Sequence, residues 1–152
     1  MSRVDFYHLQ KQNLEQVLPK LLEKAYATKQ NILIKIGNEE RVEFLNSQLW
    51  TFDDTSFIPH GSKKDGFGEY QPIWLTSGDD NPNNAKLLFL VDGAMSDIEE
   101  LQKFERIFNI FDGNSATSVE QARNFWKELK ATESMPAYYW KQDENGRWTQ
   151  AG

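Results

Sequence analysis

The chain has 152 residues, of which 39% are hydrophobic, 26% charged and 13% aromatic, a composition typical of one folded domain and not of a disordered chain. It contains no cysteine, which excludes disulfides, thiolate metal ligands and a cysteine nucleophile. The net charge of −6 argues against a surface devoted to nucleic-acid binding, because phosphate contacts require concentrated lysine and arginine.

Targeting and linker signals are missing from the sequence. The first residues lack the apolar region of a signal peptide, and no apolar run approaches the length that crosses a bilayer. There is no internal repeat, low-complexity tract or long linker. We therefore expect a single domain over residues 1–152, located in the cytoplasm and without a membrane partner.

The first third of the chain alternates between strand-like and helix-like hydrophobic patterns. Residues 4–9 are typical of a strand, and helical spacing follows, with Asn13 as N-cap and Gln16 completing a capping box. Pro19 predicts either a helix that begins later than Asn13 or a kink. Residues 32–36 predict a buried strand, after which Asn38 is placed to cap a second helix.

The same alternation continues to the end of the chain. The most continuous apolar run, residues 86–91, predicts a central strand covered on both faces. The other expected elements are a loop over 53–68, a short strand at 72–75, a turn at 77–84, a helix over 96–103, a strand at 106–111, a helix over 118–131, and a hairpin around Asn145-Gly146. Together they predict a three-layer, Rossmann-like α/β domain: a central, mostly parallel sheet with helices on both faces and a C-terminal hairpin.

Catalytic and cofactor-binding motifs are lacking. The glycine-rich stretch 61–68 has neither the Walker A spacing nor the dinucleotide-binding fingerprint, and no nucleophile elbow is present. Of the two histidines, His8 is expected to be a hydrogen-bonded structural residue, and His60 has no assignable acid–base partner. We expect no cofactor, no metal site and no catalytic residue, and a protein that acts by binding other proteins.

Two groups of residues could form binding sites. The first is Trp50 with Phe57, Pro59 and His60, at the end of a predicted helix and in the following loop. From spacing alone, these aromatics either fill the core from the loop side or anchor a partner.

The second group lies on the last predicted helix. One side of its helical wheel is apolar, and its flank is basic through Arg123, Lys127 and Lys130. Trp126 lies at the boundary between the two faces. A guanidinium beside an aromatic ring can receive a carboxylate attached to an apolar group, and the alternative is a solvated basic edge. The apolar side consists of Val119, Ala122, Phe125, Trp126 and Leu129.

The order and spacing of these features resemble the chi subunit of bacterial DNA polymerase III over residues 3–149. The motifs that carry the resemblance are Phe6-Tyr7, Leu49-Trp50, Phe57-Ile58-Pro59-His60, Pro72-Ile73, and Ala122-Arg123 with an aromatic at Trp126. The resemblance implies a Rossmann-like fold without nucleotide hydrolysis. It also implies an adaptor that joins the clamp loader, through the psi subunit, to single-stranded DNA-binding protein (SSB), without direct DNA binding.

The resemblance also assigns roles to residues. Trp50 and Phe57, with Pro59 and His60, match the psi-binding side. Arg123 and Trp126 match the residues that receive the acidic, Phe-terminated tail of SSB. Trp126 stands where the best-known member has tyrosine. Val119 stands where that member has a lysine, so Lys127 or Lys130 is expected to supply the additional charge.

Two other functions remain open from the residues alone. One is a small α/β nucleotide-binding protein or enzyme, whose ligand groups would lie near the carboxyl ends of the strands. The other is direct nucleic-acid binding through the basic helix and the hairpin that carries Trp140 and Trp148.

Overall fold

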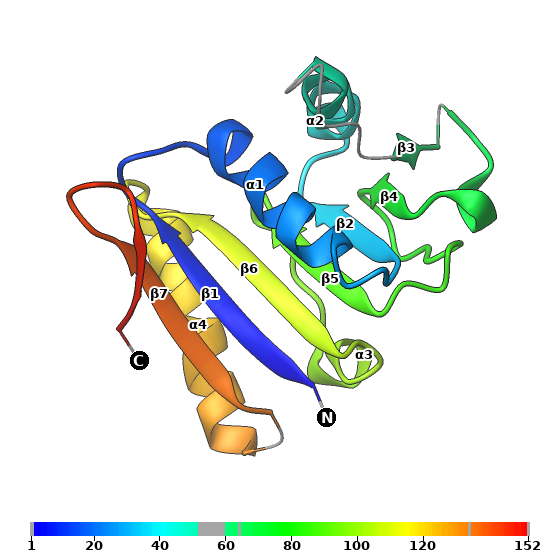
Figure 1. Ribbon diagram of the computed structural model, residues 1–152. Coiled ribbons are helices and arrows are strands. Elements are labelled where there is room, and N and C mark those ends of the chain that lie inside the picture. Colours follow the sequence, from blue (N-terminus) through cyan, green and yellow to red (C-terminus); the bar gives the residue numbers. More distant parts are fainter. Residues whose placement is uncertain (1, 52–59, 64, 134, 152) are drawn as a thin grey trace.

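A computed structural model describes residues 2–51, 60–63, 65–133 and 135–151, except for the side chains of Trp50 and Thr51 (Figure 1). Within these residues, eight strands form one sheet in the order β3-β4-β2-β5-β6-β1-β7-β8. Neighbouring strands are parallel throughout, except that β7 and β8 are antiparallel. The strands are β1 (Arg3–Leu9), β2 (Ile32–Ile36), β3 (Gly61–Ser62), β4 (Ile73–Thr76), β5 (Leu87–Val91), β6 (Arg106–Asp112), β7 (Ala137–Gln142) and β8 (Trp148–Gln150).

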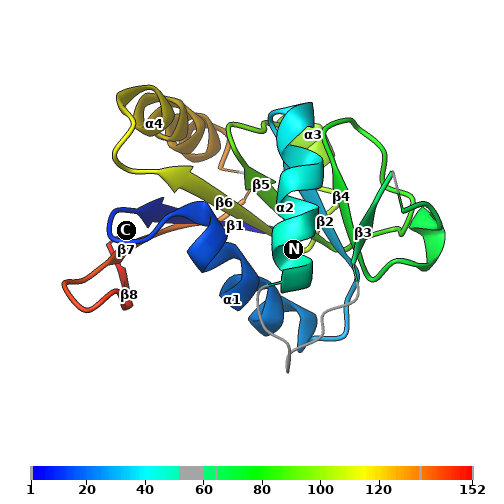
Figure 2. The same cartoon turned by 90° about the horizontal axis from the view of Figure 1, so that it is seen from above.

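Helices cover both faces of the sheet, which confirms the predicted three-layer α/β fold. Helices α1 and α2 pack on one face, and α3 and α4 pack on the other (Figure 2). A short 3-10 helix, η1, precedes β4. The helices are α1 (Leu14–Tyr26), α2 (Glu39–Thr51), η1 (Gly68–Tyr70), α3 (Ile98–Leu101) and α4 (Ala116–Thr132).

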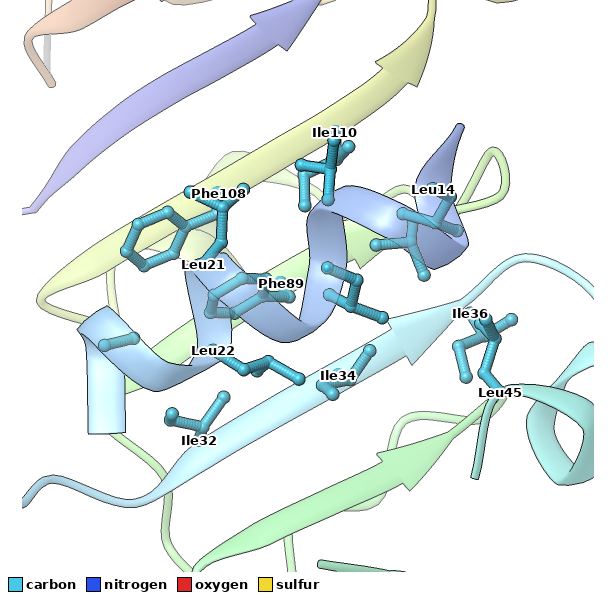
Figure 3. Close-up of a cluster of buried hydrophobic side chains, with 14 of the residues drawn as sticks. Leu14, Leu21, Leu22, Ile32, Ile34, Ile36, Leu45, Phe89, Phe108 and Ile110 are labelled. Carbon is cyan, nitrogen blue, oxygen red and sulfur yellow. The ribbon is translucent and has the colours of Figure 1, made fainter. Parts of the chain in front are cut away.

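The core on the first face lies beneath α1. The leucines of α1 point onto β2, β5 and β6, and Leu22 packs above Ile34 and Phe89, all three of which are fully buried (Figure 3). Phe89 stacks on Phe108 of the next strand with ring centroids 4.3 Å apart. Every residue of β5 is buried, as predicted for a central strand that is covered on both faces.

The N-terminus of α1 forms as the sequence predicts. The Asn13 side chain accepts a hydrogen bond from the Gln16 backbone, and the Gln16 side chain accepts one from the Asn13 backbone. This capping box begins the helix at Leu14, so Pro19 lies inside the helix and the alternative of a later start is wrong. Asn38 caps α2 as predicted, through a hydrogen bond of 2.9 Å from the Glu40 backbone.

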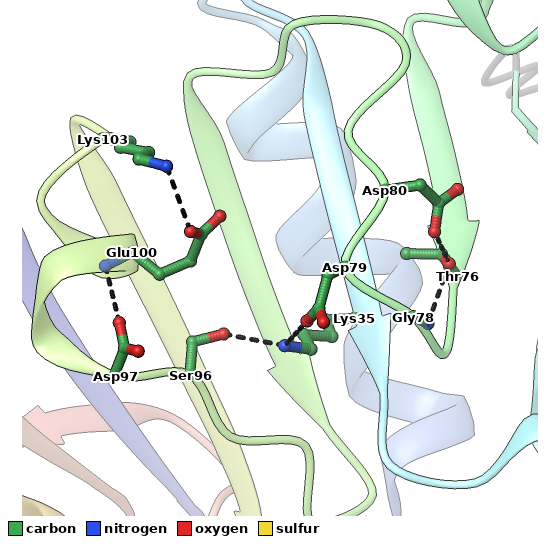
Figure 4. A network of polar contacts seen from close by, with 9 residues as sticks. All are labelled: Lys35, Thr76, Gly78, Asp79, Asp80, Ser96, Asp97, Glu100 and Lys103. Carbon is green, nitrogen blue, oxygen red and sulfur yellow. Dashed lines mark hydrogen bonds and ion pairs between the residues drawn. The ribbon is translucent and has the colours of Figure 1, made fainter.

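Two elements differ from the prediction. The helix expected over 96–103 is only one turn long, Ile98–Leu101. It also begins later than predicted, because Asp97 provides its N-cap and the Ser96 hydroxyl accepts a hydrogen bond from Lys35 (Figure 4). Lys35 also pairs with Asp79, which connects the ends of β2, β4 and β5. In the stretch predicted to be a loop, Gly61–Ser62 forms the edge strand β3. Two residues are too few to show the alternating hydrophobic pattern by which a strand is predicted.

The C-terminal hairpin is confirmed, and it extends an edge of the sheet. Asp143 accepts hydrogen bonds from the backbones of Asn145 and Arg147, and Gly146 adopts a positive φ of 79° that completes the turn. In the sequence, β7 is the next strand after β6. In the sheet, however, β7 pairs with β1 and not with β6. The first strand of the chain is therefore inserted between two strands from its last third.

Candidate protein-interaction surface

Helix α4 lies over the strands β6, β1 and β7 (Figures 1 and 2). Ser115 caps its N-terminus by accepting a hydrogen bond from the Ser118 backbone, so the helix begins before the predicted residue 118. Its buried residues are Ala122, Phe125 and Leu129, which confirms the predicted apolar side. The basic flank of the helix faces solvent.

Trp126 is half-buried at the boundary between the apolar and basic faces. Its ring meets the ring of Phe6 edge-on, with centroids 5.3 Å apart, and meets Tyr139 in the same way at 5.9 Å. The ammonium of Lys130 lies 4.7 Å from the centre of the indole. Because aromatic neighbours fix the inner part of the ring, its exposed part offers a rigid apolar surface.

Tyr139 of β7 continues this surface across the sheet edge. It lies beside Phe6 in the strand register, and its hydroxyl is 2.5 Å from Nδ1 of His8. Burial raises the pKa of Tyr139, and the positive charge of Arg123 opposes that rise. Arg123 is thus near enough to Tyr139 for their charges to interact.

The cations around these two rings are largely unpaired. Arg123 and Lys127 are exposed, and neither forms an ion pair or hydrogen bond with any residue that the structure describes. Lys141 of β7 lies 5.8 Å from the centre of the Tyr139 ring. We call this group the basic–aromatic surface: Arg123, Trp126, Lys127, Lys130, Tyr139 and Lys141.

The chemistry of this surface suits an anionic group joined to an apolar one. An unpaired guanidinium can bind a carboxylate through two parallel hydrogen bonds, and the adjacent rings can cover an apolar side chain. Sequence reasoning placed the four α4 residues but missed Tyr139 and Lys141. Their alternation in β7 shows that they share a face, yet only the insertion of β1 beside β7 places that face next to α4.

The second predicted site can be described only in part. Trp50 belongs to α2, but its side chain lies outside the described residues, as do Phe57 and Pro59. His60 is buried with 3% of its surface exposed, and its Nε2 donates a hydrogen bond to the Asn46 carbonyl oxygen at 3.1 Å.

A polar network fixes the chain next to His60 against α2. The Asp65 carboxylate accepts hydrogen bonds from the Asn46 side chain and the Ser62 backbone, at 2.7 and 3.0 Å. The Ser62 hydroxyl donates to Glu43. His60 therefore anchors β3 to α2, on the opposite sheet face from α4, and the structure does not bring the two predicted sites together.

The described part of the chain offers neither a metal site nor a membrane-spanning helix. Those residues contain no group of three or more His, Asp or Glu side chains arranged to hold a metal ion. None of the described helices is both long enough and apolar enough to pass through a bilayer. His8 is mostly buried and hydrogen-bonded, as expected for a structural histidine.

The fold and surface define a Rossmann-like α/β domain that presents aromatic rings and free cations along one helix. Residues 1–136 match the family model described as DNA polymerase III chi subunit, HolC. The chain belongs to the chi subunit family of DNA polymerase III. It is 32% identical over 111 residues to a protein of Rickettsia prowazekii described as "Probable DNA polymerase III subunit chi", an alignment that covers 73% of this chain and 66% of the relative.

Proposed function

We propose that this chain is a non-catalytic adaptor of the DNA polymerase III holoenzyme, which binds the acidic C-terminal tail of SSB and, on its other face, the psi subunit of the clamp loader. The observation that carries the proposal is the unpaired Arg123 beside the half-exposed Trp126 and Tyr139. Membership of the chi family supports it, because the resemblance implies these two partners.

Tail capture uses each part of the basic–aromatic surface differently. Arg123 pairs with the terminal carboxylate of the tail, and Trp126 packs against its last apolar side chain. Lys127, Lys130 and Lys141 attract the acidic residues that precede it. The net charge of −6 repels an acidic peptide from the rest of the surface, which favours this one acceptor.

The affinity of one tail should be modest. A short peptide makes few contacts and loses conformational freedom, and exposed charges carry much of its attraction, so micromolar, salt-sensitive binding is expected. Several tails on one DNA-bound SSB oligomer raise the effective affinity without new contacts.

The test is a fluorescence titration of an acidic peptide that ends in Pro-Phe into the wild type and Arg123→Ala. We expect about ten-fold weaker binding by Arg123→Ala, equivalent to ~1.4 kcal/mol for one charge-assisted pair. Lys20→Ala is the matched control, because it removes an exposed cation from α1 on the opposite face. Equal binding by Arg123→Ala and the wild type would refute tail capture at this site.

The proposed psi-binding side consists of Trp50, Phe57, Pro59 and His60. Its support is the position of Trp50 at the end of α2 and the buried His60, which is hydrogen-bonded to Asn46 of that helix. Co-elution with the psi subunit in size-exclusion chromatography tests it: Trp50→Ala should abolish the complex. Phe44→Ala should retain it, because that ring is an exposed aromatic earlier on the same helix. A complex that survives Trp50→Ala would contradict this side of the proposal.

A further inference from the structure

A crevice of about 870 Å³ opens outside the carboxyl ends of the strands, and its lining includes no residue of either proposed protein-binding site. It lies where β1 and β6 are neighbours but the helices that follow them, α1 and α4, leave to opposite faces of the sheet (Figures 1 and 2). Parallel α/β sheets bind small ligands at such a switch point, because the diverging connections leave a gap there. The volume is in the range of small-molecule sites.

Asn109 of β6 indicates that this crevice takes a polar ligand. The residue is only 7% exposed and lines the crevice. Its side-chain amide has no hydrogen-bond partner among the residues that the structure describes. Its amide atoms are not among the fully buried side-chain atoms that lack a partner, so they are reached from the crevice and offer both a donor and an acceptor to a bound molecule.

The surroundings of Asn109 are neutral and partly apolar. Across the crevice, α4 contributes the Ser118 hydroxyl and the Gln121 side chain, whose amide nitrogen donates to the Gly93 carbonyl oxygen and whose own oxygen is left to accept. Met95 and Ala122 add apolar walls. This combination suits a flat, heteroaromatic ring with hydrogen-bonding groups on its edge.

The charges that line the crevice nearly cancel. The cations are Lys11 and Arg41, and the carboxylates are Glu15, Asp92 and Asp112. Arg41 is already bound to Glu15 and Asp92, at 2.5 and 3.0 Å. One cation and one carboxylate therefore remain, and the loop after β1 has no glycine-rich phosphate cradle, so nothing here selects a phosphate group.

We propose that this crevice binds an uncharged nucleoside, with adenine as its base. An asparagine amide can pair with adenine through two hydrogen bonds, as acceptor for its amino group and donor to a ring nitrogen. The apolar walls cover the faces of the base, and Ser118 and Gln121 meet its sugar. This site is independent of the proposed adaptor function and does not rest on it.

The test is titration of the isotope-labelled full chain with adenosine, followed by nuclear magnetic resonance. We expect the Asn109 side-chain amide and the backbone amides at the start of α4 to shift. Asn109→Leu, which fills the same volume without polar atoms, should weaken binding at least ten-fold. Asn124→Leu, an exposed position on α4 outside the crevice, should leave binding unchanged.

Further measurements distinguish the ligand class and guard against a misfolded variant. Gln121→Ala alters a partly exposed helix residue that the core does not require, and it should also weaken adenosine binding. Adenosine monophosphate should bind no more tightly than adenosine. No shift at Asn109 with millimolar adenosine, equal binding by Asn109→Leu, or ten-fold tighter binding of the monophosphate would each overturn the proposal.

Discussion

Nδ1 of His8 and the hydroxyl of Tyr139 lie 2.5 Å apart, and this contact joins a mostly buried position in β1 to the basic–aromatic surface. The Tyr139 ring also packs edge-on against Trp126. Positions near the two ends of the chain thereby hold the exposed indole in one orientation. A fixed ring loses little conformational freedom when it binds a peptide, which favours binding.

Trp126 should determine how well the apolar end of a tail is bound. Trp126→Ala is expected to weaken binding of the acidic peptide that ends in Pro-Phe by about ten-fold or more, because an aromatic anchor is lost. Trp126→Tyr keeps a flat ring and should lose much less. Fluorescence titration measures both, with thermal unfolding to show that each variant is folded. Unchanged peptide binding by folded Trp126→Ala would contradict the assigned role.

His8 should make the protein less stable in mild acid. Burial lowers the pKa of His8 below its ordinary value of 6.5, and the charge of Lys141 lowers it further. The unfolded chain therefore binds a proton at a higher pH than the folded chain does. Stability is then lost as the pH falls through about 6.5, since the proton favours unfolding.

Urea unfolding of the wild type and His8→Gln at pH 7.5 and pH 5 measures this effect. The wild type should lose more of its free energy of unfolding between the two values than the variant does. Equal losses would show that His8 does not cause the acid sensitivity.

Asp5 should contribute to stability through a buried ionic cluster. Its fully buried carboxylate accepts hydrogen bonds from Arg3, Arg106 and the Trp140 indole. Burial alone would raise its pKa, but the bonds from Arg3 and Trp140, with the charge and bond of Arg106, hold the pKa below the ordinary 3.8. Asp5→Asn is therefore expected to cost about 2 kcal/mol at pH 7, the scale of a hydrogen bond to a charged group.

The pH dependence of that cost and a matched variant test the cause. Because the folded pKa is depressed, the contribution is complete above pH 3.8 and disappears as the pH falls through the lower, folded value. Chemical unfolding should therefore show Asp5→Asn approaching the wild type in strong acid. Asp79→Asn should cost less than about 1 kcal/mol, because its side chain in the pair with Lys35 is 94% exposed. Similar costs for both variants would contradict a special role for Asp5.

Gly113 should not tolerate a side chain. A Cβ there would lie 2.0 Å from the His8 ring and 2.5 Å from the Leu9 carbonyl oxygen, which is backbone. Gly113→Ala should therefore destabilise the protein by about 2 kcal/mol. Gly78→Ala is the control with an expected effect within about 0.5 kcal/mol, because its nearest neighbour is a side-chain oxygen of Asp80 at 3.2 Å and no backbone atom is close. Comparable melting temperatures for the two variants would contradict this packing.

Sequence patterns predicted most elements because their signals are local. The apolar run of β5 and the Asn13–Gln16 capping box each lie within a few adjacent residues. The start of α3 was predicted at Ser96, but the N-cap is Asp97. Both residue types can cap a helix, and the choice depends on the tertiary contact between Ser96 and Lys35. The parts of the candidate site on α4 were predictable for the same local reason.

Sequence patterns do not predict which strands lie next to each other in the sheet. Tyr139 joins the surface only because β1 lies between β6 and β7, a pairing that depends on the whole fold. Asn109 alternates with apolar residues as any strand residue can, and nothing in that alternation shows that it faces a crevice. The site around Trp50 and Phe57 stays a prediction.

Because β1 is inserted between β6 and β7, the surface on α4 is completed only late in the synthesis of the chain. A ribosome makes β1 first, but both of its neighbours, β6 and β7, emerge last, so pairing waits for nearly the complete chain. Until β1 pairs with these strands, Phe6 is not in the position in which its ring packs against Trp126. A nascent or prematurely terminated chain therefore lacks a finished surface on α4, and damage to the first strand would disable that surface while leaving each of its cations in place.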